Sequence, residues 1–193
     1  MRLHWRLYHP STQMAQDDLS AVTDQSNLAK LERVGGGIAI AGEIFGLVGK
    51  SQFFTEFSQE DISLLSGYME VYRAQPGEMI IREGDAGDFM VLIVEGEIDI
   101  LKKNQRGEQQ HMTSAGPGMT LGEMSMIDGE PRFATCMASQ STTFAVLTRD
   151  NMAKIILDYP DLGSKILVKM VTMLSLRLRQ TSARLLRVME DNR

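Results

Sequence analysis

Between Met69 and Leu147 the chain alternates short apolar runs with turn residues, and this spacing restricts the fold more than any other feature of the sequence. The apolar or β-branched runs lie at 79–81, 89–94, 98–101 and 143–147, and glycine-containing turns lie at 76–77, 84–87, 96, 107 and 116–118. Many short strands separated by closely spaced turns are typical of all-β architectures. The pattern predicts a compact antiparallel barrel or sandwich.

After Thr148 the apolar period becomes helical. It predicts a short helix over 151–157 and a long helix over about 162–189, with a turn at Pro160 between them. The long helix carries an a/d seam in steps of four and three, made of Leu167, Val171, Leu174, Leu178, Thr181, Leu185 and Val188. Ile166, Met170 and Met173 form an adjacent stripe that suits packing on the barrel. The seam favours a homodimer through this C-terminal helix, and the alternative is that both stripes serve one intramolecular core.

Residues 1–50 carry little pattern and are interpreted as an N-terminal leader, partly disordered, with a short helix over 27–34. Gly35-Gly36-Gly37 interrupts that helix. The ordered domain is expected over 51–193, beginning near Phe53, where Ser58 and Asp61 resemble a helix capping box.

Charge and cysteine content limit the partners that are possible. The net charge of −5 does not favour nucleic-acid binding by the whole chain. From Lys165 onward, seven basic residues face two acidic ones, so the first 164 residues carry −10. Cys136 is the only cysteine, which excludes an intrachain disulfide and suits a reducing cytoplasm. With no apolar signal core and no membrane-length segment, the chain is expected to be cytoplasmic and without membrane contact.

Residues 121–136, LGEMSMIDGEPRFATC, are the segment most suited to a ligand. Gly122 opens a helix-sized piece, and a helix N-terminus with free backbone amides suits an anion. Arg132 is able to bind a phosphate through two parallel hydrogen bonds, whereas Glu123 supplies an acceptor for sugar hydroxyls. Acceptor and cation together suit a ribose joined to a phosphodiester. The alternative is a Glu123–Arg132 salt bridge that closes the loop internally.

With its surroundings, this segment resembles the cyclic nucleotide-binding domain of the catabolite activator protein and of protein kinase A regulatory subunits, over about residues 51–185. The family's phosphate-binding cassette has the form Phe-Gly-Glu, then Pro-Arg-Ala-Ala-Thr-Val, and this chain has Leu121-Gly122-Glu123 and Pro131-Arg132-Phe133-Ala134-Thr135-Cys136. The upstream glycines at 77, 84, 87 and 96 also match. The resemblance implies an α+β fold, an antiparallel β-roll of jelly-roll type flanked by short helices, with a long C-terminal helix.

The resemblance also implies the roles of the site residues. Glu123 would accept the ribose 2′-hydroxyl, and Arg132 would pair with the cyclic phosphate. Backbone amides from Gly122 to Met124 would hold the sugar and phosphate, and the backbone of Phe133 and Ala134 would close the site. Phe133 lacks the hydroxyl that assists guanine recognition in some relatives, which favours cAMP over cGMP.

The base contact is expected from the long helix. Thr181-Ser182 resembles a Thr-Ser pair that contacts adenine in the catabolite activator, if about one extra helical turn is allowed. Without that turn, Arg177 and Leu178 would stand there instead.

The remaining expectations concern output. The chain ends at Arg193, too soon after the long helix for a helix-turn-helix, so direct DNA binding is not expected, and an unidentified protein partner or a change in the dimer would transmit the signal. Catalysis is not expected, because the histidines are only His4, His9 and His111, and Ser114 and Ser125 lack an evident His–acid partner. No cofactor is expected. The rival to a cyclic nucleotide sensor is a ligand-free dimerisation or scaffold module with the same fold.

Overall fold

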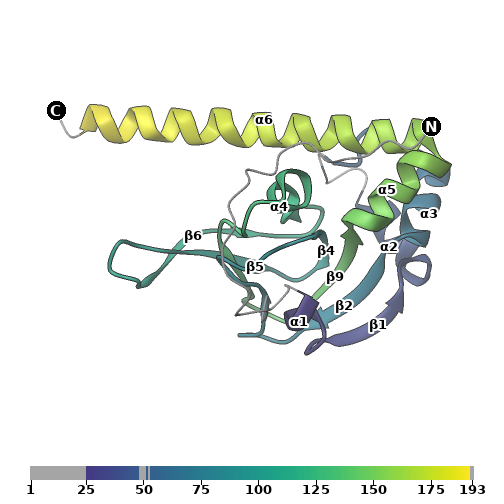
Figure 1. The fold of residues 1–193 in the computed structure, drawn as a ribbon, viewed down its shortest axis with the longest axis horizontal. Coiled ribbons are helices and arrows are strands. Elements are labelled where there is room, and N and C mark those ends of the chain that lie inside the picture. The colour runs from purple at the N-terminus through teal and green to yellow at the C-terminus, as the bar shows by residue number, and fades with distance from the viewer. Residues whose placement is uncertain (1–24, 48–50, 52, 192–193) are drawn as a thin grey trace, which may run out of the picture.

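The computed structural model describes residues 25–47, 51 and 53–191, and its central feature is a pair of antiparallel sheets (Figure 1). One sheet has the order β1-β2-β9-β4-β7 and the other β3-β8-β5-β6. The strands are β1 (Glu32–Gly36), β2 (Glu70–Ala74), β3 (Met79–Ile81), β4 (Phe89–Glu95), β5 (Ile98–Lys103), β6 (Gln109–Ala115), β7 (Thr120–Leu121), β8 (Thr135–Ala138) and β9 (Thr142–Thr148). Together they form the expected antiparallel β-roll of an α+β protein.

Short helices surround the roll, and one long helix crosses it. They are α1 (Gln25–Leu28), the 3-10 helix η1 (Gly37–Ile40), α2 (Ala41–Gly46), α3 (Gln59–Gly67), α4 (Glu123–Asp128), α5 (Arg149–Asp158) and α6 (Pro160–Asp191). Figure 1 shows α6 as one uninterrupted helix on the side of the roll where α4 lies. None of the helices in the described ranges has both the length and the apolar content needed to cross a bilayer.

The central strand β4 explains how the two layers of core form. Its residues alternate between the faces of the sheet: Phe89, Val91 and Ile93 pack inside the roll, whereas Met90 and Leu92 pack against the helices. A strand covered on both faces is apolar at every position rather than at alternate ones. The run at 89–94 therefore marks the strand between the two core layers.

Two expectations for the N-terminal part need correction. Residues 32–34, the end of the short helix expected over 27–34, instead belong to strand β1, which pairs with β2 at the sheet edge. Within the stretch assigned to the leader, the side chains of Leu28, Ile44 and Leu47 are buried in the core. The remainder of that leader, residues 1–24 and 48–50, lies outside the described residues. The capping box is confirmed, because Ser58 and Asp61 each bind the other's backbone amide.

The buried side chains that attach the long helix α6 to the domain all lie in its first half. Leu162, Ile166 and Met170 are buried, whereas all residues from Leu178 to Asp191 are exposed. Two lysines one turn apart add ion pairs, Lys165 with Asp61 at 2.5 Å and Lys169 with Glu56 at 2.7 Å. The hydrogen bond from Lys169 lowers the pKa of the Glu56 carboxyl. The second half of α6 thus extends from an anchored base.

Candidate ligand-binding site

Residues 120–134, here called the cassette segment, run from β7 through α4 to the start of β8. Gly122 has a φ of +86° and is the residue before α4, and a Cβ at this position would lie 2.6 Å from Nη1 of Arg132. Positive φ and close approach both select glycine. Gly122 thus turns the chain while allowing the Arg132 guanidinium to contact the backbone.

Arg132 lies inside the roll, and only 3% of its surface is exposed. Its Nη1 donates to the carbonyl oxygen of Gly122 at 2.9 Å, and its guanidinium carbon lies 4.4 Å from the centre of the Phe89 ring. The Arg132 backbone is held too, because its N–H donates to Asp85 and its carbonyl accepts from Gly84. The guanidinium is therefore fixed from both ends before any ligand arrives.

Space for this guanidinium depends on Gly87. A Cβ at Gly87 would lie 2.0 Å from Nε of Arg132, a distance that requires the arginine to move. The upstream glycine that the sequence comparison singled out therefore has a specific structural role. It leaves room for the side chain expected to bind phosphate.

Glu123 is buried to the same extent as Arg132 but has different partners. Thr120 Oγ1 donates to one carboxylate oxygen, and Nη1 of Arg177 lies 3.2 Å from the other. Nη2 of Arg177 also donates to the Thr120 carbonyl at 2.5 Å. The alternative Glu123–Arg132 salt bridge is wrong, because the buried carboxylate pairs with an arginine of α6.

Arg177 is the residue that sequence reasoning missed as a contact of the cassette. The sequence places it only at the nucleotide base, and only if no extra helical turn separates this chain from the catabolite activator. The need for such a contact could have been inferred, because a buried carboxylate such as that of Glu123 requires a cationic or hydrogen-bonded partner. The sequence does not show which arginine of α6 supplies it, since that depends on where the helix crosses the roll.

The other expected site residues divide into two groups. Met124 and Phe133 are exposed and Ala134 is buried, and all three belong to the cassette segment. Thr181 and Ser182 are exposed on α6, one turn beyond Arg177, and within the described residues no hydrogen bond joins either of them to the cassette. Their contact with a base stays a prediction.

A pocket of about 300 Å³ opens beside Arg177, between α6 and the loop before β7. Met173, Leu176 and Gln180 line it from α6, and Gly118 and Met119 line it from the loop. The helix therefore does not seal the roll beyond Met173, and solvent reaches the Arg177 side chain, of which 35% is exposed. The Glu123–Arg177 pair is buried on the cassette side and open on the helix side.

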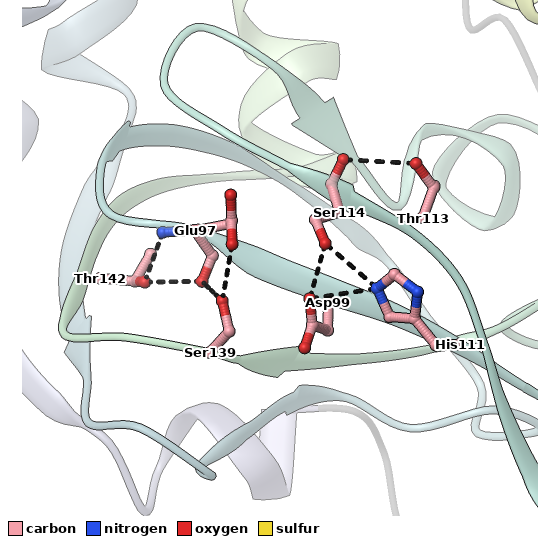
Figure 2. A network of polar contacts seen from close by, with 7 residues as sticks. All are labelled: Glu97, Asp99, His111, Thr113, Ser114, Ser139 and Thr142. Atoms are coloured by element: carbon pink, nitrogen blue, oxygen red, sulfur yellow. Dashed lines mark hydrogen bonds and ion pairs between the residues drawn. The ribbon is translucent and has the colours of Figure 1, made fainter.

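The outer face of β5 carries a polar cluster that resembles a catalytic triad in composition (Figure 2). Ser114 Oγ donates to Asp99 Oδ1 at 2.7 Å, and Nε2 of His111 lies 3.1 Å from Ser114 Oγ and 3.3 Å from Asp99 Oδ1. Ser114 therefore has both a His and an acid neighbour, which the sequence did not make evident. In a relay the two imidazole nitrogens contact serine and acid separately, whereas here one nitrogen meets both. The cluster joins β5 to β6 across the hairpin.

A metal centre receives no support from the described residues. Among them, no group of three or more His, Cys, Asp or Glu side chains has an arrangement that could hold a metal ion.

Comparison with known proteins gives a consistent family. Residues 71–159 match the family described as "Cyclic nucleotide-binding domain". A solved cyclic nucleotide-binding domain from Methylobacillus flagellatus KT is 38% identical, with a TM-score of 0.74 over 82% of this chain and 89% of that one. The Thermus thermophilus catabolite activator protein is 25% identical, with a TM-score of 0.64 over 70% of this chain and 62% of that one.

Curated relatives are more distant, and they are regulatory proteins. The Thermus thermophilus cyclic AMP receptor protein is 26% identical over 110 residues, which is 57% of this chain and 51% of the relative. A cAMP-dependent protein kinase regulatory subunit from Yarrowia lipolytica is 27% identical over 115 residues, 60% of this chain and 29% of the relative. The chain thus spans about half the length of the first relative and less than a third of the second.

Proposed function

Because this chain belongs to the cyclic nucleotide-binding domain family, we propose that it binds cAMP in the cassette segment and acts as a regulatory module without catalysis of its own. The observation that carries the proposal is the buried Arg132 guanidinium, held against the Gly122 carbonyl in a space left by Gly87. A guanidinium held in a fixed position suits a single negative phosphodiester, because its planar donors match two phosphate oxygens with two parallel hydrogen bonds.

Each end of the ligand has a matching group in the cassette. Arg132 binds the cyclic phosphate, together with backbone amides from Gly122 to Met124. Glu123 accepts the ribose 2′-hydroxyl, and its burial excludes competing water, so this hydrogen bond to a carboxylate is stronger than a neutral one. A deoxyribose cyclic nucleotide, which lacks that hydroxyl, would bind more weakly.

Adenine is preferred over guanine on two grounds. The side chain after Arg132 is Phe133, which has no hydroxyl to assist guanine recognition. The most similar curated relatives include a cyclic AMP receptor protein and a cAMP-dependent kinase regulatory subunit. We therefore expect cGMP to bind more weakly than cAMP.

The output of the site passes through Arg177. This arginine joins α6 to the Glu123 carboxylate and to the Thr120 carbonyl. The Glu123 carboxylate is also the group that would bind the ribose. A ligand that rearranges these bonds binds one position of α6 better than another and shifts the population toward it. The helix then reports occupancy to a second copy of the chain or to a protein partner.

A homodimer through α6 gives the exposed half of the helix a role. Leu178, Leu185 and Val188 of the expected seam are exposed by 68%, 60% and 55%. A helical stretch that buries nothing is marginal in water, so a partner helix would stabilise it. We place the protein in the cytoplasm, where its one cysteine, Cys136, stays reduced.

One observation favours a second candidate function, a ligand-free assembly module. The Glu123 carboxylate already has two partners from the protein, Thr120 and Arg177, and needs no ligand to satisfy it. In that case the dimer would form constitutively, and cyclic nucleotides would have no effect on it.

Calorimetric titration with cAMP and cGMP separates the two functions. We expect cAMP to bind at micromolar concentrations or below, and Arg132→Ala to abolish the signal, because a buried charge-assisted contact is lost. Arg106→Ala, at an exposed turn, is the matched control and should bind as the wild type does. Folded wild-type protein, freed of co-purified nucleotide, that gives no heat with either ligand would leave the assembly function.

A further inference from the structure

Side-chain alternation along β5 separates two faces of the roll. Ile98 and Ile100 pack into the core between the sheets, so Lys102, two residues further along the same strand, extends from that inner face. Asp99 points the other way, into the outer-face cluster of Figure 2. Lys102 therefore lies at the mouth of the roll, on the side where Arg132 is buried.

Lys102 holds the residue that follows Arg132. Its Nζ donates to the Phe133 carbonyl at 2.6 Å and lies 4.4 Å from the centre of the Phe133 ring. The same Nζ lies 2.8 Å from Oε1 of Glu83, whose pKa is lowered by the hydrogen bond from Lys102. The ring of Phe133 is thus fixed by a cation on one side, although 54% of the residue is exposed.

We propose that Phe133, held by Lys102, is a stacking platform for the purine base of the bound nucleotide. The proposal rests on cyclic nucleotide binding at the cassette and names the residues that read its base. Phe133 is about half exposed and follows the arginine that would bind the phosphate. The cation–π contact with Lys102 covers one face of its ring and leaves the other face open. Lys102 is a positioning residue, because it acts through the ring.

The geometry of the ligand makes the platform reachable. Arg132 fixes the phosphate end, and Phe133 is the next residue, so a base turned toward β5 lies over the ring. A base turned toward α6 would instead approach Thr181 and Ser182. The platform therefore assigns the base to the β5 side of the site. Stacking tolerates any purine and gains with ring area, so it favours purine over pyrimidine cyclic nucleotides.

The test uses nuclear magnetic resonance and calorimetry on the full chain with cAMP and cUMP. In the wild type, the aromatic ring current should move the adenine H2 or H8 resonance upfield, and Phe133→Leu should abolish that movement. Stacking on an aromatic side chain contributes about 1–3 kcal/mol per base, so we expect Phe133→Leu to weaken cAMP binding by about 5- to 150-fold. The loss for cUMP should be smaller.

Neighbouring lysines provide the matched pair for the positioning role. Lys102→Met removes the cation and should reduce both the cAMP affinity and the ring-current shift. Lys103→Met alters the next residue, whose side chain is exposed and points away from the inner face. Its backbone N–H would still donate to Glu83, so this variant should change neither the cAMP affinity nor the ring-current shift.

The outcomes distinguish this inference from the function on which it rests. If the wild type binds no cyclic nucleotide, the proposed function fails first. If the wild type binds cAMP but Phe133→Leu binds equally well and retains the upfield shift, the platform is wrong. A shift lost instead on Thr181→Ala would assign the base to α6 and overturn the inference.

Discussion

Two arginines of the candidate site differ in their surroundings: one belongs to the cassette segment and the other reaches it from α6. Arg132 belongs to the roll, where a glycine, an aromatic ring and two backbone contacts hold it in place. Arg177 belongs to α6, where its side chain remains partly open to solvent and the residues from Leu178 to Asp191 are all exposed. Under the proposed function we therefore expect a division of work: the roll would provide a preformed binding group, and the helix would provide a contact that can be released.

Breaking the roll side should have the largest effect. Gly87→Ala places a methyl group where Nε of Arg132 lies, so the guanidinium must leave its position. Loss of a charged hydrogen bond of about 1.5–3 kcal/mol would weaken cAMP binding about 10- to 150-fold, as measured by calorimetry. Gly116→Ala is the matched control, because no heavy atom lies within 4 Å of the added Cβ. Equal affinities for the two variants would contradict a preformed arginine.

Removing the helix contact should change the effect of cAMP on dimerisation more than it changes the affinity for cAMP. Arg177→Met removes the link between α6 and Glu123. We expect the cAMP affinity to change by less than about tenfold, whereas the dimer dissociation constant becomes independent of cAMP. Analytical ultracentrifugation with and without cAMP measures this directly. Arg184→Met, at an exposed position of the same helix, should retain the wild-type response.

The smallest expected effect concerns the Glu83–Lys102 ion pair at the mouth of the roll. The hydrogen bond from Lys102 lowers the pKa of Glu83, so the ionised form stabilises the folded state. That contribution is present above the ordinary glutamate pKa, near 4.5, and is lost as pH falls through the lower folded pKa.

Urea unfolding at pH 7 and pH 3.5 checks this effect. Compared with Glu83→Gln, the wild type should lose up to about 1 kcal/mol more of its unfolding free energy on acidification, because a partly exposed ion pair contributes little more. Identical pH dependence in the two proteins would mean that the ionised Glu83–Lys102 pair does not stabilise the folded state.

The sequence predicted the parts of the fold that bury apolar side chains. The runs at 79–81, 89–94, 98–101 and 143–147 all became strands, because burial on one or both faces leaves a pattern in composition. Strands β1, β2, β6 and β7 were not among the predicted runs: β2 and β7 bury only one or two apolar side chains each, and β1 and β6 are largely exposed. The residues of β6 from Gln109 to Thr113 are exposed, so no alternation distinguishes them from a polar loop.

Prediction of the site was limited in a similar way. Gly122, Glu123 and Arg132 lie close together in sequence, so a local motif was enough to find them. Arg177 lies 54 residues beyond Glu123, and its pairing depends on the angle and register at which α6 crosses the roll. Nothing in local sequence fixes that register, because arginines also occur at 179, 184 and 187 of the same helix.

The anchored base and exposed end of α6 also have a geometric consequence. Met170 is the last buried residue of the helix, and Asp191 lies about 32 Å further along the axis at 1.5 Å per residue. A tilt of about 10° near Met170 would displace that end sideways by about 5–6 Å, roughly one helical turn. The same tilt would move Arg177, about 10 Å beyond Met170, by about 2 Å. The helix would therefore act as a lever arm, converting a rearrangement of about 2 Å around Glu123 into a movement comparable to the width of a side-chain interface.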